Sequence, residues 1–261
     1  MNRLDRSALT RNLQAAQPLG ATLRPANLAT AIGSILGVAM PALALAADAG
    51  SSISVDNSSS RGTGSSVTAK GAAHWEVKSG HVRGVGDRQV GFNSFRQFGV
   101  EAGQTVDLIL PTSGGSQVNS LVNLVWDSTS PSYINGTLNS VLADGSVGGR
   151  VYFVDPRGVL VGQQGVVNVG SLSIATPTRS VMDDMLAGGS ALQALLGGSL
   201  SAEQISADGQ VSIASRINAS NGVQVQARSI DVSGTILVAA RNAQTNTDFD
   251  LETLRAVNLA E

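Results

Sequence analysis

Residues 205–238 read ISADGQVSIASRINASNGVQVQARSIDVSGTILV, and this stretch decides the fold. Apolar residues alternate with polar residues or glycine through short runs, as in Ile230–Val238. Such period-two alternation gives a β-strand one buried face and one exposed face. Gly209, Gly222 and Gly234 lie 13 and 12 residues apart, so we interpret the recurrence as short strands that stack on successive turns of a solenoid. A meander of ordinary hairpins is the alternative.

The rest of the chain downstream of residue 73 has a similar texture. Short runs of valine, leucine and isoleucine are separated by Gly, Asn and Asp, and only 3% of the residues are aromatic. Small and β-branched residues in short runs are typical of many short strands joined by tight turns. The tetrapeptide Asp155-Pro156-Arg157-Gly158 matches a type I turn, because Asp caps position i, Pro fixes φ at i+1 and Gly occupies i+3. The sequence therefore predicts an all-β fold.

Residues 178–200 break this pattern and predict a short helical insert. Ser180 can act as the N-terminal cap, two acidic residues follow in the first turn, and Gly188-Gly189 ends the helix. Val181, Met182, Met185 and Leu186 form an apolar stripe at helical spacing, which we expect to pack against the solenoid.

The first 46 residues predict a cleaved signal peptide with a long, basic n-region. Residues 28–46 carry no charge, and Ala44-Leu45-Ala46 supplies the small-x-small pattern for cleavage before Ala47. A membrane anchor of roughly 20 residues is the alternative. Cleavage would remove four basic residues and one acidic residue, changing the net charge from −2 to −5 (17 − 4 = 13 basic, 19 − 1 = 18 acidic). The mature chain is expected to be exported and mildly acidic.

Three further segments follow the predicted signal peptide. Residues 47–72 are rich in Ser and Gly and form a flexible leader or a weak first strand. Residues 73–240 form the β-helix, and residues 241–261 are a tail or a truncated continuation. The chain has no cysteine, which excludes disulfides and thiol catalysis. Its acidic balance argues against a nucleic-acid surface.

No group of residues predicts an active site, a metal site or a cofactor. His74 and His81 have no carboxylate at ligand spacing, so we interpret both as surface or structural residues. A polysaccharide-cleaving β-helix needs carboxylates on adjacent coils, and a carbohydrate-active enzyme is the less favoured alternative. The acids that we considered each stand alone beside turn residues: Asp107, Asp127, Asp144 and Asp155.

Four motifs between residues 90 and 176 carry a resemblance to a known family. In this order, behind a signal peptide, they resemble the two-partner secretion domain of filamentous haemagglutinin-type exoproteins, and the closest likeness is to leukotoxin-like filamentous adhesins. Asp155 and Arg157 replace two asparagines of the family's N-P-N-G turn. The motifs are Asn93-Ser94-Phe95-Arg96-Gln97-Phe98, Ile134-Asn135-Gly136-Thr137-Leu138, Asp155-Pro156-Arg157-Gly158 and Asn168-Val169-Gly170-Ser171-Leu172.

The resemblance implies a right-handed parallel β-helix that is secreted or displayed at the cell surface of a Gram-negative type of cell, by way of the periplasm. It implies a secretion and targeting domain that nucleates β-helix folding. The expected partners are the general secretion machinery, a dedicated outer-membrane β-barrel transporter with periplasmic binding domains, and a host-cell or carbohydrate receptor. A self-assembling matrix or adhesin protein is the second hypothesis. The candidate recognition or turn-forming residues are Asn93, Phe95, Phe98, Asn135, Gly136, Asp155, Pro156 and Gly158.

Overall fold

The computed structural model describes residues 51–126, 129–241, 249–251 and 255–258. The predicted signal peptide, its cleavage site at Ala44, Ala46 and Ala47, and Asp127 lie outside the described residues. Within those ranges, no helix has the length and apolar character needed to cross a membrane.

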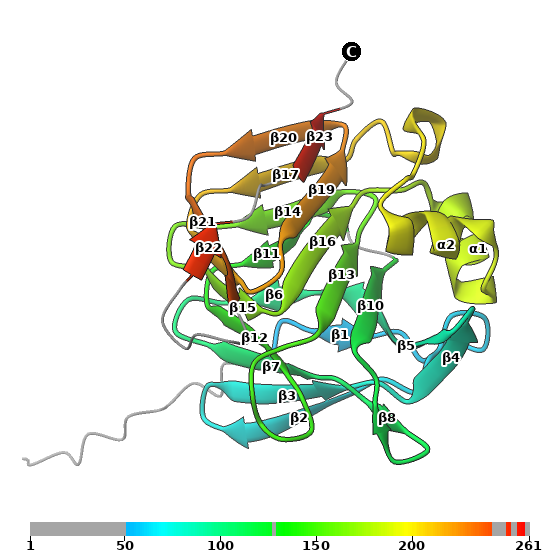
Figure 1. Cartoon of the computed structure of the whole chain (residues 1–261), viewed down its shortest axis with the longest axis horizontal. Coiled ribbons are helices and arrows are strands. Elements are labelled where there is room, and N and C mark those ends of the chain that lie inside the picture. Colours follow the sequence, from blue (N-terminus) through cyan, green and yellow to red (C-terminus); the bar gives the residue numbers. More distant parts are fainter. Residues whose placement is uncertain (1–50, 127–128, 242–248, 252–254, 259–261) are drawn as a thin grey trace, which may run out of the picture. The chain divides into compact units, whose positions relative to one another are not determined.

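The chain winds through three parallel sheets, one after another, and then returns to the first on the next coil (Figure 1). Each coil contributes a strand to sheet A, then sheet C, then sheet B, and pairs in parallel with the coil before it. This confirms the predicted parallel β-helix and excludes the hairpin meander, while the right-handed winding stays a prediction.

Sheet A comprises β5 (Arg88–Gln97), β10 (Ser120–Val125), β13 (Arg150–Val154), β16 (Ser171–Ala175), β19 (Val223–Ala227) and β23 (Arg255–Asn258). Sheet B comprises β3 (His74–Lys78), β7 (Thr105–Ile109), β12 (Thr137–Val141), β15 (Val166–Val169), β18 (Arg216–Ala219) and β21 (Thr235–Arg241). Sheet C comprises β6 (Gly99–Val100), β11 (Ser132–Ile134), β14 (Gly158–Val161), β17 (Gln210–Ile213) and β20 (Ser229–Val232).

The register corrects the interpretation of the recurring glycines. Val211 pairs with Ile230 and Ile217 pairs with Ile236, so one coil spans 230 − 211 = 19 residues here. The glycine spacing of 13 and 12 residues is therefore about two-thirds of a coil. The strands that follow the three glycines, β17, β19 and β21, lie in sheets C, A and B respectively. The glycines mark corners, and equivalent positions on successive coils are set by the register instead.

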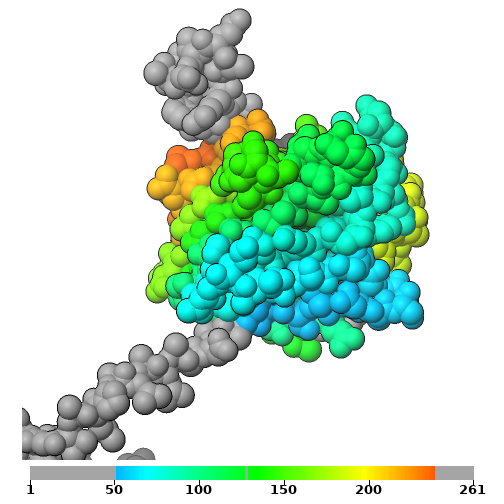
Figure 2. All heavy atoms as spheres, turned by 90° about the horizontal axis from the view of Figure 1, so that it is seen from below, coloured from blue at the N-terminus to red at the C-terminus, as the bar shows by residue number. Residues whose placement is uncertain are grey.

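Antiparallel strands close the N-terminal end of the solenoid. β1 (Ser54–Val55) pairs with β5, and β2 (Ser66–Gly71) pairs with β3. Ile53 is buried in the solenoid core beside them. Figure 2 looks at this end, where N-terminal residues, coloured blue to cyan, spread across much of the surface. β1 and β2 lie within residues 47–72, the segment for which the sequence predicted a flexible leader or a weak first strand. Other antiparallel strands are β4 (His81–Val85) on β5, the hairpin of β8 (Thr112–Ser113) and β9 (Ser116–Gln117), and β22 (Phe249–Leu251) on β21.

The interior of the solenoid is apolar and built from inward-facing residues of all three sheets. Phe98 packs edge-to-face against both Phe95 and Phe153, with ring centroids 5.2 and 5.0 Å apart. Such aromatic pairs contribute about 0.5–1.5 kcal/mol each beyond the burial of their area. Stacked valines, leucines and isoleucines continue this core along the coils.

The inner face of sheet A is buried, and part of its outer face is buried as well, because the helical insert covers that part. β10 has no exposed residue, whereas β7 and β12 alternate between buried and half-buried positions. The insert comprises α1 (Arg179–Ala187), α2 (Ser190–Gly197) and the short 3-10 helix η2 (Ala202–Gln204), and it enters between β16 and β17. The predicted insert is thus confirmed, and α1 and α2 lie outside the coils beside sheet A (Figure 1). The outer core joins Phe92, Val122, Leu124, Trp126, Tyr152 and Val154 of the solenoid to Met182, Met185, Leu192, Leu195 and Leu200 of the insert.

The N-terminal end of α1 differs from the prediction in two details. Thr178, not Ser180, occupies the N-terminal cap of α1, and neither acidic residue lies in the first turn. Gly188 ends α1 in the left-handed conformation (φ 83°), as the sequence predicted. The carboxylate of Asp184 instead accepts a hydrogen bond from the amide of Ala191 at 2.8 Å. It therefore satisfies a free backbone donor at the start of α2.

Candidate functional site

The tetrapeptide Asp155–Gly158 forms the corner between β13 in sheet A and β14 in sheet C. The amide of Gly158 donates to the carbonyl of Asp155 at 3.0 Å, which closes the predicted turn. The amide of Arg157 donates to Oδ1 of Asp155 at 2.9 Å. Gly158 has φ 112° and lies directly against the next coil, since a Cβ atom there would be 1.6 Å from the carbonyl oxygen of Gln210. Only glycine satisfies both conditions.

The side chain of Asp155 bonds this corner to the preceding coil. It is only 1% exposed, and its Oδ2 accepts hydrogen bonds from both the amide (3.0 Å) and the hydroxyl (2.7 Å) of Ser132 in β11. Burial raises the pKa of the Asp155 carboxyl, and the hydrogen bonds from Ser132, Arg157 and Gly158 only partly oppose that rise. Asp155 therefore joins two successive coils by buried hydrogen bonds.

Asn135 and Gly136 form a different corner, between β11 in sheet C and β12 in sheet B. Their amides both donate to the carbonyl of Val100 on the preceding coil, at 2.7 and 3.2 Å. A Cβ atom on Gly136 would lie 2.3 Å from the carbonyl oxygen of Glu101, so the position requires glycine. The half-buried side chain of Asn135 lies against Gly162 of the next coil.

Asn93, Phe95 and Phe98 lie inside the solenoid and are at most 1% exposed. The side-chain Nδ2 of Asn93 donates to Oδ1 of Asn123 at 3.0 Å, and Nδ2 of Asn123 donates to the backbone carbonyl of Tyr152 at 3.2 Å. Buried amides of this kind are retained where every polar group finds a partner. The sequence-derived set therefore occupies three places: the core, the corner at Gly136 and the corner at Asp155.

A groove of about 300 Å³ opens beside the corner at Asp155. The exposed side chain of Arg157 and the half-buried Pro156 lie at this groove. Trp126 forms another part of its wall, donates from Nε1 to the hydroxyl of Ser94 at 2.7 Å, and lies 4.5 Å below the guanidinium of Arg61. We call this the corner groove. Its lining residues are Trp126, Asp155, Pro156, Arg157, Thr178, Arg179, Ser206, Ala207 and Asp208.

Sequence reasoning missed Trp126, Arg179 and Asp208 as neighbours of the turn. Trp126 carried a usable signal, because it is one of only two tryptophans in a chain with 3% aromatic residues. Arg179 and Asp208 carried none, since they reach the groove only through the path of the insert. Their convergence is a property of the folded coils.

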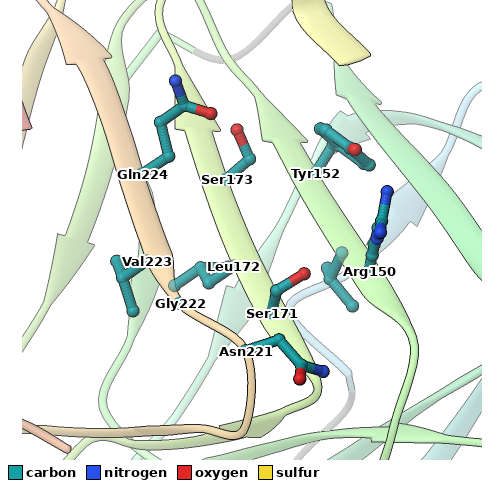
Figure 3. A pocket seen from close by; sticks show the side chains of 10 residues that line it. Arg150, Tyr152, Ser171, Leu172, Ser173, Asn221, Gly222, Val223 and Gln224 are labelled. Atoms are coloured by element: carbon teal, nitrogen blue, oxygen red, sulfur yellow. The ribbon is translucent and has the colours of Figure 1, made fainter. Parts of the chain in front are cut away.

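A second groove of about 300 Å³ lies on the outer face of sheet A (Figure 3). β13, β16, β19 and the turn before β19 supply its side chains, which are mostly polar and include no carboxylate. We call it the sheet A groove, and no motif in the sequence predicted it. Its lining residues are Arg150, Val151, Tyr152, Ser171, Leu172, Ser173, Asn221, Gly222, Val223 and Gln224.

Of the acidic side chains considered from the sequence, those that the structure describes each bond to a nearby group. Asp107 accepts from Asn139 at 2.8 Å and lies 2.7 Å from Nε2 of His74. Asp144 accepts hydrogen bonds from Ser146 within its own turn. In the part of the chain that the structure describes, no three His, Cys, Asp or Glu side chains are placed to hold a metal ion.

A comparison with protein-family profiles matches residues 53–256 to the family described as "TPS secretion domain". The match begins in the N-terminal closing strands and extends through all three sheets and the insert. A search of curated proteins finds no match for the chain.

Proposed function

The chain belongs to the TPS secretion domain family, and on that premise we propose that it is the N-terminal secretion domain of an exported filamentous adhesin. Members of this family are secretion and targeting domains of two-partner secretion exoproteins and are not a catalytic family. They cross the outer membrane with a cognate transporter. Residues 1–46 are proposed to be removed as a signal peptide, residues 47–72 to lead into the solenoid, and residues 241–261 to be a tail or continuation.

We propose that the transporter's periplasmic domains bind the folded solenoid at the corner groove. The observation that carries this proposal is the exposure of Arg157 beside the buried, coil-bonded Asp155. Asp155 and Gly158 hold the turn rigid, so Pro156 and Arg157 are presented in one conformation. An exposed guanidinium on a fixed turn suits a carboxylate-bearing partner surface.

Asn93, Phe95 and Phe98 are proposed to act differently, because a folded domain hides them. A partner contacts these residues only before the first coil closes. Their buried positions support a role in nucleating the fold, where Phe95 and Phe98 form the first aromatic pair of the core. Each later coil then finds a template of parallel strands already in register. The folded domain, held by the transporter, then serves as the template on which further coils form at the cell surface, and their folding supplies a forward bias for export.

The test is to express the chain in its host with an internal tag near residues 57–66 and to compare strains with and without the outer-membrane barrel. The tagged protein is then measured in the periplasm, on the surface and in the medium. We expect material outside the cell only when the barrel is present. Retention in the periplasm in both strains would contradict the secretion proposal.

Arg157→Glu tests the recognition site within the same assay. We expect binding to the transporter to weaken at least about tenfold and the exported fraction to fall with it, because one charge-assisted contact contributes about 1.5–3 kcal/mol. Arg216→Glu, at another exposed arginine on sheet B, is the matched control and should export normally. Circular dichroism must show that both variants fold. Equal export of the two variants would remove the corner groove as the recognition surface and leave the secretion function standing.

A further inference from the structure

The sheet A groove crosses three successive coils and has two walls and a floor. Figure 3 shows Arg150 and Tyr152 of β13 on one side and Gln224 of β19 on the other, with Asn221 below Ser171 at the lower end of the groove. Ser171 and Ser173 of β16 lie between them. Tyr152, Ser173 and Gln224 occupy the same row across the sheet, because Tyr152 pairs with Ser173 and Ser173 with Gln224 in register.

One buried polar group of this groove has no hydrogen-bond partner within the described part of the protein. Ser173 is 7% exposed, and its hydroxyl has no hydrogen-bond partner among the described residues. A buried hydroxyl without a partner costs free energy unless a ligand or water satisfies it. Gln224 donates from Nε2 to the carbonyl of Gly198 at 3.2 Å, which holds its side chain in place and leaves Oε1 to accept. Asn221 is exposed and adds both a donor and an acceptor.

The charge at the groove is positive, although the chain as a whole is acidic. Arg150 is exposed at one wall. Burial raises the pKa of the Tyr152 hydroxyl, and the nearby guanidiniums of Arg150 and Arg88 oppose that rise only in part. A neighbouring groove shares Arg150 and adds Arg88, Gln117 and Asn119, together with Asp87. The groove itself contains no carboxylate to repel an anion.

We propose that the sheet A groove binds an acidic sugar residue of the uronate type. Such a ligand carries one carboxylate, which fits Arg150, and several hydroxyls, which both donate and accept. The hydroxyls match Ser173, Asn221 and Oε1 of Gln224. A volume of about 300 Å³ is at the small end for ligand sites, so it holds one or two sugar rings. An acidic peptide is disfavoured because the exposed surface between the walls offers serines and amides rather than apolar side chains.

The test titrates the full protein with D-galacturonate, with neutral methyl galactoside and with sulfate, using ligand-detected NMR. We expect saturable binding of galacturonate, and binding of the neutral sugar that is about tenfold weaker, as expected for the loss of one charge-assisted hydrogen bond. Arg150→Gln should weaken galacturonate binding about tenfold and leave the neutral sugar unchanged. Ser173→Ala should weaken both sugars by a similar, smaller factor.

Arg216→Gln is the charge-matched control, because it removes one exposed positive charge from sheet B. It should leave galacturonate binding unchanged, which separates the groove from the effect of net charge. Sulfate that binds as tightly as galacturonate would overturn the sugar proposal and identify a simple anion site. No saturable binding of galacturonate, or no effect of Arg150→Gln, would overturn the site altogether. None of these outcomes depends on whether the transporter recognises the chain.

Discussion

Asn168 donates a hydrogen bond from Nδ2 to Oδ1 of Asn139, at 2.8 Å, on the outer face of sheet B. The same contact repeats below, where Asn139 donates to Asp107 at 2.8 Å, and above, where Asn218 donates to Asn168 at 2.7 Å. Asp107 has no hydrogen to donate when ionised. The carboxylate of Asp107 therefore fixes the direction in which every side-chain amide above it donates. We call this row of Asp107, Asn139, Asn168 and Asn218 the asparagine ladder, and it holds successive coils in register.

Interrupting this ladder should destabilise the solenoid. Asn168→Ala removes one donated and one accepted hydrogen bond, so we expect the free energy of unfolding to fall by about 1–3 kcal/mol. Asn168→Asp should cost at least as much, because two acceptors then face each other at Asn139. Urea unfolding measures both changes. Asn221→Ala, at an exposed asparagine outside the ladder, is the control and should change stability by less than about 0.5 kcal/mol. An equal loss for Asn221→Ala would contradict the ladder's role.

Gly158 and Gly86 form a matched pair for testing how closely the coils approach. Both have positive φ (112° and 60°), but a Cβ atom on Gly86 meets nothing within 4 Å, whereas one on Gly158 overlaps the carbonyl of Gln210. Gly86→Ala should cost about 1–2 kcal/mol for the left-handed backbone alone. Gly158→Ala should cost more than about 4 kcal/mol or prevent folding, since backbone must move. Thermal unfolding compares them, and similar melting temperatures would show that the corner yields to a methyl group.

Asp155 should make stability depend on pH in an unusual direction for a carboxylate. Its folded pKa is raised by burial, so between the unfolded pKa of about 3.9 and the higher folded value the folded state binds more protons. The contribution of Asp155 to the free energy of unfolding is therefore fully present below about pH 3.9 and is lost as pH rises through its folded pKa. Asp155→Asn removes this titration.

The measurement for Asp155 is the difference in unfolding free energy between Asp155→Asn and the original protein from pH 4 to 7. We expect the variant to gain relative stability as pH rises, with a slope of at most about 1.4 kcal/mol per pH unit. Taking the difference cancels groups with lowered pKa values, such as Glu76, whose pKa is held down by Lys78 and Lys70. Parallel pH profiles would contradict a raised pKa at Asp155.

The fold was accessible from sequence because its signals are local. Alternation in residues 205–238 requires one buried face per strand, and the turn at Asp155 requires Pro and Gly where they stand. The coil length was not accessible from the same stretch. Because each coil has three corners, these glycines recur about every two-thirds of a coil, and their spacing does not give the 19-residue register between Val211 and Ile230. The spacing between turns can be read from neighbouring residues in the sequence. The register cannot, because it depends on which strands pair between coils.

The candidate sites were less accessible, because they depend on contacts across coils. The motif residues Asn93 and Phe95 resemble recognition residues in sequence, yet burial places them in the core. The groove that contains Ser173 unites residues of β13 and β16 with residues at β19, and the insert separates β19 from the other two strands along the chain. His74 and Asp107 lie 33 residues apart and still meet at 2.7 Å. No local spacing rule predicts such pairs.

The helical insert should be necessary for solubility rather than for the solenoid itself. Leu192 and Leu195 are fully buried against the outer face of sheet A, next to Phe92 and Val122. Replacing both leucines with serine removes the apolar contacts that hold α2, while the inner core is untouched. We expect α1 and α2 to detach and the apolar residues on the outer face of sheet A, such as Phe92 and Val122, to become exposed. Dye fluorescence with anilinonaphthalene sulfonate should rise, and amides of residues 179–197 should exchange faster than those of β10 and β13.

Leu196→Ser is the matched control for this variant, because Leu196 is a neighbouring, only partly buried leucine. It should bind little dye and keep the slow exchange of α2. Far-ultraviolet circular dichroism should retain the β signal in both proteins, since the backbone ladders of all three sheets lie outside the insert. Loss of that signal in the double variant would mean that the outer core supports the coils themselves. The helices would then be an integral layer of the fold and not a cover on a solenoid that stands without them.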